Sequence, residues 1–219
     1  MDTDKNPYLT PAKGINSDHP TVKAFARKHA GNAPGPRELA VNFYYAIRDG
    51  IRYFPYAVDI SVIGLRASTT VENGYGWCVP KSALLAACCR ASGIPARMGF
   101  ADVKNHMTNE RLKRNMLNKD IFYWHGYASI YIDGVWVKAT PVFNLELCKR
   151  FRLKPLEFDG RNDALYHPFD EDGNQHMTYV NYRGEFTDVP VNRILNKFKK
   201  EYSEHLFKKN PHDGEDFST

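Results

Sequence analysis

No apolar run in this sequence approaches the roughly 18 residues that read as a membrane-spanning helix. The opening residues, MDTDKNPYLTPAKG, also lack the basic and apolar regions of a secretory signal. The four cysteines form no CxxC pair and no framework of the secreted type, so we expect reduced thiols. These absences argue against membrane proteins and secreted disulfide-rich proteins, and they favour a cytoplasmic protein with no membrane partner.

The sequence also has no strong charge bias and no metal-binding motif. There are 30 Lys and Arg residues against 25 Asp and Glu residues, and the surplus lies mostly in the N-terminal third. Mixed signs elsewhere argue against a stripe that binds nucleic acid. His106, His167 and His176 belong to no His-Glu-x-x-His or paired-cysteine pattern. We therefore expect no nucleic-acid partner, no metal site and no cofactor.

What is present fits one globular domain. A chain of 219 residues that is 42% hydrophobic can form a sizeable core without a disulfide or a metal. The sequence shows no internal repeat, no low-complexity tract and no break in composition. We expect a poorly ordered arm, or a strap over the surface, in residues 1–17. A single domain then spans residues 18–208, and residues 209–219 form a frayed tail.

The N-terminal third predicts two helices. The first begins near Pro20, with Asp18 as its cap, and ends at Gly31. The second runs from Pro36 to Gly50, where apolar residues recur at helical spacing. An extended segment, IRYFPYAVDISVIGL, follows the second helix.

The C-terminal half predicts strands and one last helix. IFYWHGYASIYI and VWVKATPV read as two strands joined by an Asp133–Gly134 turn, which is a strong hairpin signal. HMTYVNYR reads as a later strand, and residues 163–190 as short strands and turns. Asp188 and Pro190 then open a final helix, VNRILNKFKKEYSEHLF.

The segment GYGWCVPKSALLAACCRASG carries the clearest chemical signal. Its run SALLAACCRAS is small or apolar almost all round, which predicts a buried helix that begins at Cys78. Free N–H groups and the macrodipole at a helix N-terminus favour a thiolate, so Cys78 is the candidate nucleophile. His125, on a predicted strand, is the candidate partner that moves the proton. The remaining thiols are expected to fill the core: Cys88, Cys89 and Cys148.

Several of these residues occur in a recognisable order. Gly76-Trp77-Cys78, the small-residue helix and the run RASGIPAR resemble the core of the transglutaminase-like superfamily. So do His125, the Asp133–Gly134 turn and Trp136. The resemblance covers about residues 36–145. The later stretch from FDGRNDALYHPFD to HMTYV resembles the continuation found in a microbial, cysteine-protease-like branch.

The resemblance implies an α+β fold of the papain-like, transglutaminase-like type, in which a central helix bearing the cysteine packs on an antiparallel sheet. It also implies a triad of Cys, His and Asp, to which Cys78 and His125 correspond. The family's Asp falls four residues after the strand-opening Trp136, where this sequence has Thr140. A threonine brings no charge, so it is a weak third member. Asn144 is the alternative, because papain-like enzymes use Asn as the orienting group.

The implied activity is thiol-dependent acyl transfer on a carboxamide of a peptide or protein. The thioester on Cys78 passes either to water, as in a protease or amidase, or to an amine, as in a transglutaminase. The backbone N–H of Cys78 is the expected oxyanion donor, with Asn73 or Trp77 as the second. Because the triad Asp is missing, the alternative is a catalytically weak or inactive module that binds peptides or a partner protein.

Overall fold

The protein is a mixture of helices and strands. The computed structural model describes residues 6–56, 58–105, 114, 116–165, 172–173 and 177–207. The helices are α1 (Pro20–His29), α2 (Pro36–Gly50), α3 (Ala67–Asn73), α4 (Cys78–Ala91), α6 (Leu145–Arg150), α7 (Val191–Glu201) and the 3-10 helix η1 (Glu204–Phe207). The strands are β1 (Arg52–Tyr53), β2 (Tyr75–Gly76), β3 (Ala96–Asn105), β4 (Ile121–Ile132), β5 (Val135–Ala139) and β6 (Met177–Phe186).

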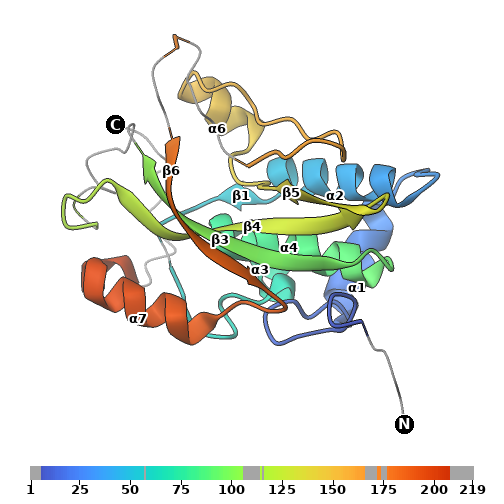
Figure 1. The fold of residues 1–219 in the computed structure, drawn as a ribbon, viewed down its shortest axis with the longest axis horizontal. Coiled ribbons are helices and arrows are strands. Elements are labelled where there is room, and N and C mark those ends of the chain that lie inside the picture. Colours follow the sequence, from blue (N-terminus) through green and yellow to red (C-terminus); the bar gives the residue numbers. More distant parts are fainter. Residues whose placement is uncertain are drawn as a thin grey trace.

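The sheet and the helix that begins at Cys78 form the centre of the molecule. The strands pair in the order β5-β4-β3-β6, and every pair is antiparallel. Helix α4 lies behind this curled sheet and contacts β3 and β4, while α1, α2 and α3 pack around α4 (Figure 1). The expected α+β fold, with a central cysteine-bearing helix on an antiparallel sheet, is confirmed.

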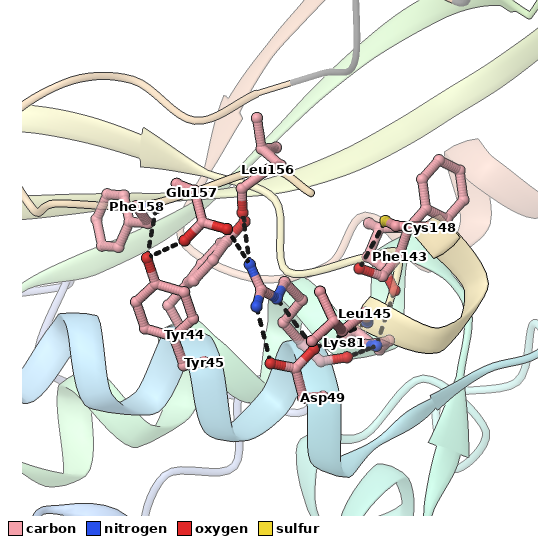
Figure 2. Close-up of polar contacts among 12 residues, drawn as sticks. Tyr44, Tyr45, Asp49, Lys81, Phe143, Leu145, Cys148, Leu156, Glu157 and Phe158 are labelled. Carbon is pink, nitrogen blue, oxygen red and sulfur yellow. Dashed lines mark hydrogen bonds and ion pairs between the residues drawn. The ribbon is translucent and has the colours of Figure 1, made fainter. Parts of the chain in front are cut away.

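Helix α4 is enclosed because most of its side chains are small. Every residue from Cys78 to Arg90 is buried. Lys81 is fully buried too, and its ammonium donates to the carbonyl oxygens of Arg48, Ile51 and Val142. Figure 2 shows Lys81 among the polar contacts in this part of the molecule. Burial lowers the pKa of Lys81 to about 7. Lys81 thus ties the first turns of α4 to the end of α2 and to the segment that follows β5.

Residues 6–17 lie as a strap over the domain, which is one of the two forms expected for residues 1–17. Ile15 is fully buried. Its backbone N–H donates to the carboxylate of Asp188, as do those of Lys13 and Gly14. This carboxylate therefore holds the strap, whereas the sequence predicted that it caps the last helix. Residues 1–5 and the expected tail at 209–219 lie outside the described part.

Other boundaries follow the predictions with local corrections. Helix α1 begins at Pro20 as expected, but its N-cap is His19, whose ring accepts from the N–H of Thr21, and not Asp18. Helix α2 and strand β4 have the predicted bounds. The β4–β5 hairpin turns at Asp133 and Gly134, which both have the positive φ that such a turn requires. The final helix ends at Glu201, six residues before the predicted end, and η1 follows.

Candidate functional site

Cys78 is the first residue of α4, as predicted, and Trp77 is the N-cap. The backbone of Trp77 is extended, so the chain turns sharply into the helix at this point. Cys78 is 6% exposed, whereas the other thiols are fully buried: Cys88, Cys89 and Cys148. Among the described residues, Cys78 is therefore the thiol that a reagent can approach.

A small cavity brings Cys78 and His125 together. Its volume is about 40 Å³, which has room for only a few water molecules. His125 is the sole basic side chain among the described residues that line it. Apart from Cys78 and His125, the lining is aromatic and apolar. It comes from β1 and the segment after it, from the residue before α4, from β4 and the segment before it, and from the α7–η1 region: Tyr53, Pro55, Val58, Trp77, Met116, Phe122, Tyr123, Phe198, Tyr202 and Leu206.

A glycine sets the distance between α4 and the strand that carries His125. A Cβ atom on Gly126 would lie 3.1 Å from the Cα atom of Val79, so the strand and the helix backbone approach closely here. The hydroxyl of Ser82 donates to the carbonyl of Gly126 at 3.1 Å and fixes this approach. Gly126 was not predicted as a site residue, because the close packing of α4 and β4 is a tertiary feature.

We expect Gly126→Ala to disturb the site. The added methyl group overlaps the first turn of α4, so the helix or the strand must shift, at a cost of about 1–3 kcal/mol in the free energy of unfolding. Urea unfolding measures this cost. Gly50→Ala is the matched control, because a Cβ atom there meets nothing within 4 Å. An unfolding midpoint equal to that of Gly50→Ala would contradict the close approach.

Burial dominates the titration of Cys78. It raises the pKa of the thiol to about 12, while the backbone N–H groups of Gly126, Val79 and Cys78 itself oppose the rise. The net direction is opposite to the depressed pKa that the helix N-terminus predicted. The N–H groups are present as expected, but the apolar lining removes the water that would stabilise the anion. The raised pKa therefore favours the protonated thiol in this pocket.

The two candidates for the third position, Thr140 and Asn144, are not among the described residues that line the pocket. Thr140 follows β5, and its N–H donates to the carbonyl of Ala164. Its buried hydroxyl makes no hydrogen bond within the described part of the chain. Asn144 is the N-cap of α6, and its side chain makes no capping hydrogen bond. Both assignments stay predictions.

The two candidates for the second oxyanion donor differ in position. A second, more polar cavity of about 310 Å³ also has Trp77 in its lining. Asn73, at the end of α3, lines this second cavity only, whereas Trp77 lines both cavities. Trp77 is thus closer to the thiol, although its role as a donor stays a prediction.

Neither a metal-binding cluster nor a membrane-spanning helix occurs among the described residues. They contain no group of three or more His, Cys, Asp or Glu side chains arranged to hold a metal ion. His106, His167 and His176 lie outside the described part. None of the described helices is long and apolar enough to cross a membrane.

Cys78, at the start of α4, and His125, on β4, thus line one cavity of an α+β fold. The chain belongs to the transglutaminase-like superfamily, whose core model matches residues 23–141, more than half of its length. No curated protein sequence matches the chain.

Two solved structures resemble the chain. The first, described as a "Putative Cysteine Protease from Cytophaga hutchinsonii", is 20% identical with a TM-score of 0.51, and the match covers 87% of this chain and 50% of that one. The second, described as a "Putative Protease from Parabacteroides distasonis", is 16% identical with a TM-score of 0.38, over 62% of this chain and 26% of that one. The chain thus spans about half of the first structure, and the likeness to it shows the fold.

Proposed function

We propose that the protein catalyses acyl transfer from a carboxamide of a peptide or protein, with Cys78 as nucleophile and His125 as base and acid. The shared pocket is the observation that carries this proposal, because it joins the most accessible described thiol to the sole basic side chain of the lining. Family membership supports it. The peptide substrate and a cytoplasmic location stay predictions.

The steps follow from the chemistry of a protonated thiol. His125 takes the proton of Cys78 as the sulfur attacks the carbonyl carbon. The backbone N–H of Cys78 stabilises the oxyanion, the C–N bond breaks, and His125 gives its proton to the leaving amine. Water or a second amine then attacks the thioester and gives a proton to His125. The C–S bond breaks, and the proton returns to the sulfur.

The apolar lining favours a resting pair in which both groups are neutral. Separating charge in a pocket with few polar atoms is costly, because little water stabilises the ions. Burial therefore keeps the proton on Cys78 until the attack begins. Because His125 removes the proton of Cys78 during the attack, the reaction does not need a free thiolate beforehand. A raised thiol pKa is therefore compatible with turnover.

Acylation by para-nitrophenyl acetate tests this proposal without knowledge of the natural substrate. The reagent transfers an acetyl group to a nucleophilic thiol and releases a coloured phenol. We expect a burst of one phenol per chain, with the acetyl group on the peptide that contains Cys78. Equal acetylation of all four cysteines under native conditions would contradict a dedicated nucleophile.

A non-catalytic module that binds peptides is the second candidate. Thr140 favours it, because this residue stands where the family has a charged Asp and its hydroxyl lacks a partner within the described part. Absence of a burst, together with binding of peptides by the folded protein, is the result that would select it over the enzyme.

The third member can be identified with two alanine variants. If Thr140 orients the imidazole during turnover, Thr140→Ala should slow acetylation about tenfold, because the hydroxyl then contributes roughly one hydrogen bond and no charge. If Asn144 orients the imidazole instead, then Asn144→Ala shows the larger loss. Burst rates of both variants decide between them. Wild-type rates in both would show that neither residue orients His125.

A further inference from the structure

Asp102 is the sole buried carboxylate among the residues that the structure describes. Its two oxygens accept from the guanidinium of Arg183 at 2.8 and 2.6 Å. The same carboxylate accepts from the backbone N–H of Trp124 at 3.1 Å and from the amide of Asn181 at 3.4 Å. A buried charge with this many donors is held firmly in one orientation.

The pairing of β3 with β4 is irregular at Asp102. Ala101 pairs with His125, and Val103 pairs with Phe122, so the single residue Asp102 faces two residues of β4. This is a β-bulge, a feature that is common beside active sites because it changes the direction of a side chain. The bulge ends at His125.

The pairing of β3 with β6 is irregular at the same level. Phe100 pairs with Gly184, while the next residue, Ala101, pairs with Tyr182. Arg183 is left out of the register, and its side chain turns to Asp102. The ion pair therefore joins β6 to β3, and the N–H of Trp124 joins β4 to the same carboxylate.

Trp124, the residue before His125, has a left-handed backbone with φ of 56°. A bulky aromatic residue rarely adopts this conformation, and it persists only where the surroundings hold it. The hydrogen bond from the N–H of Trp124 to the carboxylate of Asp102 stabilises this conformation. The Trp124 ring is buried against Phe100, and the Arg183 guanidinium lies 5.3 Å from its centre.

We propose that Asp102 is a positioning residue for His125. Its carboxylate, oriented by Arg183, holds the backbone of Trp124 in the left-handed conformation and so fixes the direction in which His125 enters the pocket of Cys78. The proposal rests on the proposed function, in which His125 is the base. It also explains how the imidazole is oriented when the family's Asp is replaced by Thr140.

The experiment compares Asp102 with a matched ion pair on the same two strands. Arg97 on β3 and Glu185 on β6 form that pair, and the Glu185 side chain is nearly as buried as that of Asp102. The variants are Asp102→Ala, Asp102→Asn and Glu185→Ala. The acetylation rate and the apparent KM of para-nitrophenyl acetate are measured with the unfolding midpoint of each variant.

We expect Asp102→Ala to lower the acetylation rate by about 10- to 100-fold with an unchanged KM, because a misplaced base slows the chemical step alone. Asp102→Asn keeps an oxygen that accepts from Trp124, so it should restore most of the rate. Glu185→Ala should keep the wild-type rate even if its unfolding midpoint falls equally. Equal rates for Asp102→Ala and Glu185→Ala, or an Asp102→Asn variant as slow as Asp102→Ala, would overturn the proposal.

Two further variants keep the test decisive. If Asp102→Ala does not fold, Arg183→Lys replaces it, since a lysine cannot form the two-pronged contact that orients the carboxylate. A several-fold slower acetylation is then expected, and a wild-type rate would overturn the proposal. His125→Ala separates the proposed function from the positioning role of Asp102. A wild-type acetylation rate in His125→Ala would overturn both. A slow rate in His125→Ala together with a wild-type rate in Asp102→Ala would overturn the positioning role alone.

Discussion

Replacing Cys78 by alanine is expected to abolish acyl transfer while leaving the fold in place. No other described thiol reaches the pocket, so the loss should be about four to six orders of magnitude, as for removal of a nucleophile from a triad. Removing one small buried side chain costs only about 1 kcal/mol in the free energy of unfolding. The measurement is the para-nitrophenyl acetate burst, with the acetylated peptide identified by mass spectrometry.

Cys88→Ala is the matched control for this variant. Cys88 lies on the same helix and is fully buried, but it does not line the pocket. We expect its burst to equal that of the wild type, with a similar loss of stability. A burst that survives in Cys78→Ala, or that disappears in Cys88→Ala, would show that another group receives the acyl chain or that the helix as a whole was disturbed.

The position of Cys78 could be predicted from the sequence because it follows from local chemistry. Small residues and cysteines along SALLAACCRAS suit a helix enclosed on all sides, and the turn before it is rich in glycine. The hairpin from β4 to β5 could be predicted for the same reason, since Asp133 and Gly134 adopt positive φ readily. In both cases a few adjacent residues determine the structure.

The parts that the sequence did not predict depend on tertiary contacts. Strand β3 reads as ARMGFADVKN, which has no clean alternation, because its neighbours on both sides introduce bulges. Helices α3 and α6 have only 7 and 6 residues, too few for a periodic signal. In the described part of the extended segment after α2, the strand is limited to Arg52 and Tyr53, which pair with β2.

The direction of the Cys78 pKa could not be predicted from the helix start alone. The helix N-terminus supplies N–H groups that favour the thiolate, and these groups are in place. However, aromatic residues from the α7–η1 region, such as Phe198 and Tyr202, close over the thiol from a distant part of the sequence. Desolvation then outweighs the N–H groups, so the tertiary structure reverses the sign of the local effect.

Because the pKa of the Cys78 thiol is raised, the reaction depends on His125 as a base. Replacement of His125 is therefore expected to have the second large effect. Without a base, the thiol must lose its proton to solvent before it attacks, and burial raises its pKa to about 12. We expect His125→Ala to slow acetylation by about two to four orders of magnitude near neutral pH. His125 is buried, so the variant should lose about 0.5–3 kcal/mol in the free energy of unfolding, and its unfolding midpoint checks that it remains folded.

The pH dependence of the acetylation rate tests whether His125 is the base. In the wild type the rate should fall on the acid side, because a protonated imidazole cannot accept the proton of Cys78. In His125→Ala that acid limb should disappear, and the rate should keep rising toward the high pKa of the buried thiol. His29→Ala is the control, since His29 lies on α1 and does not line the pocket. A His125→Ala profile that overlays the wild type would show that Cys78 has a different base.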